Sequence, residues 1–252
     1  EGFKVPDIAE FEKLVTPATR AVLISNPCNP SGKLFTKDEM LAIGDFCRRH
    51  DLFLISDEVY REFCYTEEPH FSAMNIPGCE QNVILADSVS KRYNLCGARI
   101  GCIVSHNKDV MAAALKFAQS RLCPPVLGQY AAIGALDTPQ SYFDEVKAEY
   151  IRRRDCAVRM LNAMPGVFAP TPYGAFYTVV ELPVDDAEDF ARWMLTDFSM
   201  DGATTMVTPA TSFYKTPGAG RNHARIAYVL EVPELEKALN ILGEGLKEYC
   251  KR

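Results

Sequence analysis

The sequence predicts an α/β protein with a mostly parallel β-sheet in its amino-terminal part and a smaller α/β domain after it. Three short apolar runs, at residues 20–25, 52–56 and 83–86, each end in polar or turn-forming residues. Runs of this length and composition are typical of buried strands in a parallel sheet. A fourth run, at residues 100–104, predicts a further strand, so the segment before it connects two core strands.

Helical patterns separate these strands. Residues 36–39 have the pattern of a capping box, and the helix that they open extends to about Arg49. This helix is the crossover that a parallel connection between the first two strands requires. Residues 107–136 also predict helix, interrupted by two prolines. A short helical segment at residues 8–15 precedes the first strand.

A long, highly charged helix begins at Ser141, and we place a domain boundary near its start. Residues 1–140 then belong to the larger domain, and residues 141–252 form a small carboxy-terminal domain. The last helix, from Pro233, repeats apolar residues on one face and is expected to pack against its domain. The other predicted elements of this domain are a helix at 186–198 and strands at 176–180, 204–207 and 225–230.

Composition excludes several classes of protein. The formal net charge of −6 gives no basic surface for nucleic acid, and no apolar run approaches the roughly 18 residues that span a membrane. The nine cysteines are odd in number and lack a C-x-x-C pair, so we expect reduced, packed thiols and a cytoplasmic location. The four histidines are far apart in sequence and predict no metal site.

Polar residues follow three of the predicted strands. Ligands of open α/β sheets bind beyond the carboxyl ends of the strands, so these residues predict one shared site. Its expected members are Asn29, Asp57, Tyr60, Ser88, Lys91 and Arg99.

Lys91 is the most informative of these residues. A lysine in a loop is usually a solvated surface group. Here Ser88 stands three residues before it and Arg99 eight residues after it. An amine, a hydroxyl and a guanidinium at one strand end can hold an aldehyde cofactor and its phosphate together.

Five segments carry a resemblance to a known family. Residues 26–32, 57–60 and 88–101 resemble the signature of the fold-type I pyridoxal-phosphate (PLP) enzymes, and within them the class I aminotransferases related to aspartate aminotransferase. The similarity continues through residues 173–177 and 225–228, so it covers almost the whole chain. It implies the PLP-dependent transferase fold type I, with residues 1–140 as the remaining part of the large PLP-binding domain.

The resemblance assigns a role to each expected site residue. It implies that Lys91 forms a Schiff base with PLP and then acts as the general base. It also implies that Asp57 faces the pyridine nitrogen and keeps it protonated. The other implied roles are hydrogen bonds from Asn29 and Tyr60 to the phenolic oxygen of PLP, and phosphate binding by Ser88 and Arg99.

Two arginines are candidates for substrate binding. Arg225 resembles the arginine that binds the α-carboxylate of the amino acid in this family, where a planar guanidinium can bind it with two hydrogen bonds. The alternative is a surface arginine on an exposed strand edge. Arg121 lies near the region of side-chain recognition and is a candidate for a distal carboxylate. Its alternative is a solvated arginine at a helix end.

The resemblance implies a PLP-dependent aminotransferase of amino-acid metabolism. Its substrates would be an amino acid, aspartate or a related one, and a 2-oxo acid, and its assembly a homodimer. Since only a short segment precedes the first motif, we expect the carboxy-terminal portion of such an enzyme, with an incomplete large domain and impaired activity on its own. Two alternatives stay open: another PLP-dependent reaction, of a lyase or decarboxylase, and a non-catalytic aminotransferase-like sensor domain of a transcriptional regulator.

Overall fold

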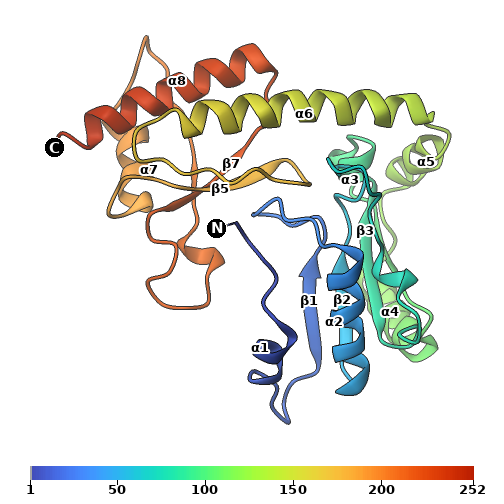
Figure 1. Ribbon diagram of the computed structural model, residues 1–252. Helices are drawn as coiled ribbons and strands as arrows, with labels where there is room; N and C mark the ends of the chain where they lie inside the picture. Colours follow the sequence, from blue (N-terminus) through green and yellow to red (C-terminus); the bar gives the residue numbers. More distant parts are fainter. Residues whose placement is uncertain (1) are drawn as a thin grey trace. The chain divides into compact units, whose positions relative to one another are not determined.

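The computed structural model describes residues 2–252 and forms two compact units. The amino-terminal unit consists of Lys4–Cys28 and Lys33–Asp144. The carboxy-terminal unit consists of Glu145–Arg252, together with Asn29–Gly32 and residues 2–3. Each unit has its own β-sheet (Figure 1). The assignment of PLP binding to residues 1–140 stays a prediction.

The amino-terminal unit is built on a four-stranded sheet in the order β1-β2-β3-β4. Strands β1 (Ala21–Ser25), β2 (Phe53–Asp57) and β3 (Val83–Ser88) are parallel, and β4 (Gly101–Val104) pairs antiparallel with β3. The predicted α/β class with a mostly parallel sheet is therefore confirmed. Because the three parallel strands are in register, their carboxyl ends lie at one edge of the sheet.

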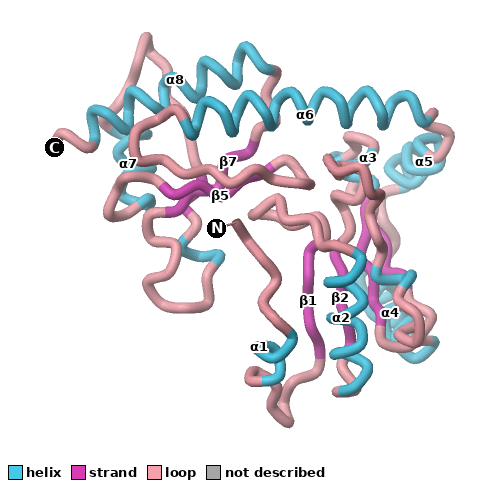
Figure 2. The backbone as a smooth tube through the Cα atoms, viewed as in Figure 1, coloured by secondary structure: helices cyan, strands magenta, loops and turns pink. Residues whose placement is uncertain are grey.

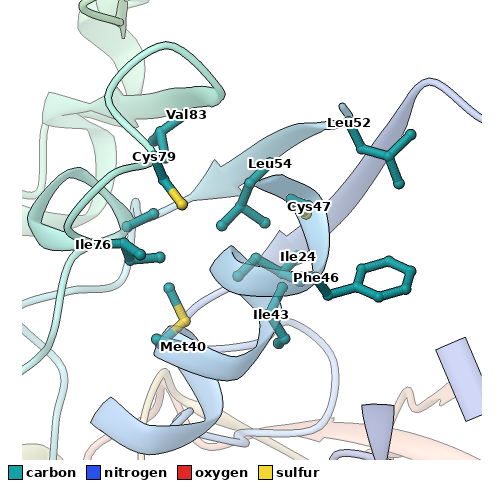
Figure 3. Packing of buried hydrophobic residues seen from close by; sticks show 11 residues of the cluster. Ile24, Met40, Ile43, Phe46, Cys47, Leu52, Leu54, Ile76, Cys79 and Val83 are labelled. Carbon is teal, nitrogen blue, oxygen red and sulfur yellow. The ribbon is translucent and has the colours of Figure 1, made fainter. Parts of the chain in front are cut away.

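Helix α2 (Lys37–Arg49) connects β1 to β2 and covers one face of this sheet. The capping box is present: the Thr36 side chain accepts the Glu39 N–H, and the Glu39 carboxylate accepts the Thr36 N–H. Figure 3 shows the apolar face of α2 against strand side chains. The buried cluster consists of Ile24, Met40, Ile43, Phe46, Cys47, Leu52, Leu54, Ala73, Ile76, Cys79 and Val83.

Strand β4, on the far side of the sheet from β1, differs from the expectation of a buried strand. All four residues of β4 are exposed, including Ile103 at 49%, so the predicted core strand is a strand but not a core one. β4 is an edge strand of this sheet, and an apolar run cannot by itself indicate whether a second layer covers it. Helices α4 (Lys108–Arg121) and α5 (Val126–Ala135) are separated at the two prolines, as the sequence predicts. Both helices also expose many apolar side chains.

Three short elements complete the amino-terminal unit. Helix α1 (Ile8–Glu12) precedes β1, and helix α3 (Val89–Arg92) directly follows β3. The 3₁₀ turns are η1 (Ala73–Asn75) and η2 (Cys96–Ala98). α3 carries the predicted lysine.

The carboxy-terminal unit contains a three-stranded antiparallel sheet in the order β5-β7-β6. Figure 2 shows β5 and β7 of this sheet as magenta segments. Its strands are β5 (Tyr177–Glu181), β6 (Thr208–Pro209) and β7 (His223–Ala227). Its helices are α6 (Gln140–Asn162, which begins before the division at Asp144), α7 (Ala187–Thr196) and α8 (Val232–Tyr249), with the 3₁₀ turn η3 (Thr211–Phe213). The strand predicted at 204–207 is wrong, because pairing with β7 begins only at Thr208.

Helix α8 buries the face that its apolar periodicity predicts. Leu235, Leu239, Leu242 and Leu246 are each at most 4% exposed. This spacing of three and four residues places side chains on one stripe of a helix. The expectation that α8 packs against its domain is confirmed.

The cysteines form no disulfide in residues 2–252. Cys47, Cys64, Cys79 and Cys156 are buried. The expected packing is wrong for four others, since Cys96, Cys102, Cys123 and Cys250 are exposed. Within residues 2–252 no helix is long and apolar enough to cross a membrane, and no cluster of potential metal ligands occurs in that range.

The capping box gives a testable stability contribution. Replacing Thr36 by Ala removes the oxygen that accepts the Glu39 N–H, so Thr36→Ala is expected to lower the free energy of unfolding by about 1 kcal/mol. Urea denaturation measures this change. Thr36→Ser keeps the oxygen and is the control, and an equal loss in both variants would contradict the capping role.

Candidate functional site

Asp57 ends β2 at the sheet edge where the three parallel strands terminate. Its main chain lies between Ser25 and Ala86 in the sheet register, and its carboxylate accepts the N–H of Val59 at 3.2 Å. The side chain is half-buried. Burial raises its pKa above the usual range, the Val59 hydrogen bond opposes this, and the negative charge of Asp87 raises it further. A carboxylate in this setting favours a cationic partner.

Tyr60 follows in the turn after β2 and is only 3% exposed. Its ring packs edge-on against Phe63, with 6.4 Å between ring centroids. The Nζ atom of Lys91 lies over the Tyr60 ring, 6.0 Å from its centroid. The structure therefore brings together the lysine and tyrosine that the sequence predicted to share a site.

Ser88 is both the last residue of β3 and the N-cap of α3. Its hydroxyl accepts the N–H of Ser90 at 3.2 Å, which starts the single turn that carries Lys91. Lys91 is half-buried on this turn. The segment that was predicted to connect two strands therefore begins with a short helix directly after β3. This helix gives Lys91 a defined position beside the sheet.

Arg99 lies eight residues beyond Lys91, just before β4. Its backbone is left-handed, with φ of 58°, a conformation that costs free energy in a residue with a side chain. Its guanidinium donates to the carbonyl of Cys96 at 2.9 Å and is exposed. The structure thus leaves this charge on the surface near the Lys91 turn, where an anion can reach it.

Asn29 and Arg225 lie together in the carboxy-terminal unit. Arg225 Nη1 donates to Asn29 Oδ1 at 3.0 Å, and its guanidinium carbon lies 4.9 Å from the Tyr177 ring centroid and 5.5 Å from that of Phe213. Arg225 is on β7, which is the central strand of its sheet and not an edge strand. Its Nε is buried without a hydrogen-bond partner.

The Asn29 segment is fixed by a close backbone contact at Gly32. The carbonyl of Gly32 accepts the N–H groups of Tyr173 and Gly174 at 3.0 and 2.9 Å. Gly32 has φ of 69°, and a Cβ there would lie 2.2 Å from Cβ of Pro172. Only glycine fits this position, so the turn can hold Asn29 against Arg225.

Arg121 is the last residue of α4 and is exposed. Within residues 2–252 its side chain makes no hydrogen bond or ion pair. The structure does not join Arg121 to the Lys91 cluster, so its role in recognising a distal carboxylate stays a prediction.

Sequence reasoning missed a buried polar network directly behind Asp57. Glu58 is fully buried, and its Oε1 accepts the Ala73 N–H at 2.8 Å and the Ser56 hydroxyl at 3.1 Å. Its Oε2 has no hydrogen bond and lies 3.9 Å from Nε2 of His70. Burial lowers the pKa of His70, which bonds the carbonyl of Asn26 at 3.1 Å. The sequence shows only that Glu58 follows Asp57 at the end of an apolar run, which does not indicate that its side chain is buried.

A second missed feature is an ion pair around Lys91. Arg92 Nη2 donates to Asp87 Oδ2 at 2.7 Å, and both side chains are nearly buried. The two residues stand on either side of the Ser88-to-Lys91 segment. Opposite charges flanking that segment were visible in the sequence, but their contact depends on the turn made by α3.

The expected members of the site are divided between the two units. The amino-terminal unit holds Asp57, Tyr60, Ser88, Lys91 and Arg99, and the carboxy-terminal unit holds Asn29 and Arg225. Their convergence on one ligand stays a prediction. The first set offers an amine, a carboxylate and hydrogen-bond donors for an anion. The second offers a guanidinium in a fixed orientation that can bind a carboxylate.

Comparison with known proteins identifies the family. Residues 3–242 match the family described as aminotransferase class I and II, so the chain belongs to this family. The family implies PLP as cofactor in general. Aspartate aminotransferase of Pyrococcus abyssi is 32% identical over 247 residues, and aromatic-amino-acid aminotransferase 2 of Thermococcus litoralis is 32% identical over 245 residues. Each alignment covers 96% of this chain and 61% of the relative.

Solved structures agree with this assignment. An aromatic aminotransferase of Pyrococcus horikoshii superposes with a TM-score of 0.82 at 32% identity, covering 97% of this chain and 64% of that one. Aspartate aminotransferase of Thermus thermophilus, solved with maleate, gives 0.84 at 28% identity, covering 96% and 60%. The fold is that of the fold-type I PLP-dependent transferases, and the chain spans about three fifths of the length of these relatives.

The raised pKa of Asp57 predicts a pH-dependent stability. A carboxyl group whose folded pKa is raised stabilises the folded state below its unfolded pKa, and this stability is lost as the pH rises through the folded pKa. Asp57→Asn removes the ionisable group, so the variant does not lose this stability as the pH rises. The Asn side-chain oxygen can still accept the hydrogen bond from the Val59 N–H. At pH 7 we therefore expect the PLP-free variant to melt at a higher temperature than the parent, and the difference to shrink as the pH falls below the usual pKa of an aspartate.

Asp45→Asn is the matched control, because Arg48 and Arg49 lower the pKa of Asp45. This variant should lose stability at pH 7 rather than gain it. A difference between Asp57→Asn and the parent that does not change with pH would contradict the effect assigned to burial of Asp57.

Proposed function

We propose that this chain provides the PLP-binding and substrate-carboxylate-binding residues of an aminotransferase. The observation that carries the proposal is the alignment of strand ends in the amino-terminal unit. Asp57 pairs with Ala86, two residues before Ser88, and the turn with Lys91 follows immediately. An acid, a hydroxyl and an amine are thus attached to one rigid sheet edge.

The residues present suit PLP. Half-buried Asp57 favours a cationic partner such as a protonated pyridine nitrogen, and Lys91 supplies a primary amine for the aldehyde. The Ser88 hydroxyl and the exposed Arg99 guanidinium would hold the phosphate. Asn29 and Tyr60 are proposed as donors to the phenolic oxygen.

PLP, when bound, supplies an electron sink for the bonds at the substrate Cα. The chemistry of the chain itself lies with Lys91 and Asp57. Lys91 Nζ would be the amine that bonds the PLP aldehyde, and as a free amine it would carry the proton to and from the substrate Cα. Asp57 would face the pyridine nitrogen and keep it protonated.

Arg225 is proposed to bind the α-carboxylate of every substrate. Asn29 and two aromatic rings fix the orientation of its guanidinium, and its buried Nε lacks an acceptor. A carboxylate oxygen would satisfy that donor. An unsatisfied buried donor costs about 1–3 kcal/mol, so the site favours an anion.

The substrates are proposed to be an amino acid, aspartate or a related one, and a 2-oxo acid. The names of the relatives from Pyrococcus abyssi and Thermococcus litoralis support aspartate and aromatic amino acids as the substrates to assay first. A cytoplasmic homodimer is the proposed state of the whole enzyme.

The Lys91 assignment can be tested directly. Incubation of the protein with PLP should give a visible absorbance band, and borohydride reduction should attach the cofactor to the peptide that contains Lys91. Lys91→Ala should remove the label and reduce turnover by at least ~1,000-fold, because one residue supplies both the anchor and the base.

Peptide mapping by mass spectrometry reads the label. Lys33→Ala is the control, since Lys33 is paired with Glu39 beside α2. Labelling of another lysine would overturn the assignment. Labelling of Lys91 without exchange of amino groups between amino acids and 2-oxo acids would favour the lyase, decarboxylase or sensor alternatives.

Substrate binding separates the two arginines. Arg225→Ala should lower kcat/KM by ~30-fold or more for aspartate and for neutral or aromatic amino acids alike, because every substrate loses its carboxylate partner. Arg121→Ala should impair only aspartate if Arg121 binds the distal carboxylate. Steady-state kinetics with aspartate, phenylalanine and alanine distinguish the roles, and equal losses with Arg121→Ala would exclude it from side-chain recognition.

A further inference from the structure

The turn that carries Lys91 is too short to be stable by itself. α3 contains only four residues, and a helix of this length has not recovered the entropy cost of nucleation. Its position must therefore come from side-chain contacts around it. In the structure, one carboxylate makes these contacts.

The carboxylate of Asp87 bonds both ends of the turn. Its Oδ1 accepts the backbone N–H of Ser88 at 2.7 Å, and its Oδ2 accepts Nη2 of Arg92 at 2.7 Å. Asp87 and Arg92 side chains are only 10% and 11% exposed. Short, charge-assisted bonds in such a setting are stronger than neutral ones.

The same pair is tied to the loop that carries Tyr60. Arg92 Nε lies 3.3 Å from Oε1 of Glu62, and Arg61 lies 3.6 Å from Asp87 and 3.7 Å from Glu62. Two acidic side chains and two arginines thus form a network of ion pairs that joins the loop after β2 to the end of β3 and the turn after it. Lys91 lies over the Tyr60 ring between these segments.

We propose that Asp87 and Arg92 are positioning residues that hold Lys91 at the geometry needed to bond PLP. Arg92 also pairs with Asp87 and so offsets part of the negative charge that acts on Asp57. This inference rests on the proposed function, because it assigns a purpose to the fixed position of Lys91. Neither residue touches the reacting atoms.

The test compares Asp87→Asn, Arg92→Gln, the double variant and the conservative Arg92→Lys. Hydrogen–deuterium exchange without PLP should be about tenfold faster in the peptide spanning residues 86–94 of both single variants, a factor equivalent to about 1.4 kcal/mol. The PLP dissociation constant should rise about tenfold, and the pH midpoint of the visible band should shift. The double variant should be no worse than either single one, and Arg92→Lys should recover most of the affinity.

Arg48→Gln is the matched control, because Arg48 and Asp45 form an exposed pair on α2 of the same unit. It should change neither the exchange of residues 86–94 nor PLP affinity. Unchanged exchange and unchanged PLP affinity in Arg92→Gln would overturn the inference, as would a loss of melting temperature with normal PLP affinity and a normal pH midpoint. If Asp87→Asn does not fold, Arg92→Gln and Arg92→Lys decide the question.

Failure of this inference is distinguishable from failure of the proposed function. Parent protein that gives no label at Lys91 would refute the function, whereas the exchange measurement without PLP still tests the ion pair. A parent that is labelled normally, with Arg92→Gln equal to it in every measurement, would refute the positioning role alone.

Discussion

Backbone hydrogen bonds across β1, β2 and β3 determine where the chemical groups of the amino-terminal unit lie. The ladder continues past the strand ends, since Asn26 N–H donates to the Asp57 carbonyl at 2.8 Å and Glu58 N–H to that of Ala86 at 3.0 Å. A shift of one residue in this register would turn Asp57 to the other face of the sheet. Burial of the α2 cluster against the same strands keeps the register unique, so the hydrophobic core and the site depend on one arrangement.

That arrangement places polar groups where burial is unfavourable. Asp57 has a raised pKa, and Glu58 keeps one carboxylate oxygen without a hydrogen bond. Each group costs stability in the unliganded protein. Such costs are typical of sites prepared for a charged ligand, because the ligand supplies the missing partners. These buried polar groups make the polar edge of the sheet less stable than its core.

Local signals explain how much of this could be predicted. The capping box at Thr36, the apolar face of α8 and the parallel strands all arise from residues close in sequence, and all were found. The exposure of β4, the start of pairing at Thr208 and the exposure of four of the cysteines depend on neighbours distant in sequence, and there the predictions failed. The resemblance to aminotransferases pointed to Arg225, but only the structure shows it on a central strand and in contact with two aromatic rings.

The two units present their ionic groups in different ways, and the difference matches the proposed roles. Arg225 is held by an amide and by aromatic faces, which fix a guanidinium without neutralising it. Its charge therefore stays available to a carboxylate. Arg92 is instead paired with Asp87, so its charge serves to fix the backbone beside Lys91. An arginine that binds a substrate anion must keep its positive charge uncompensated. An arginine that positions the backbone acts through the acidic side chain that neutralises it. The partners of each guanidinium, rather than its exposure alone, distinguish the two.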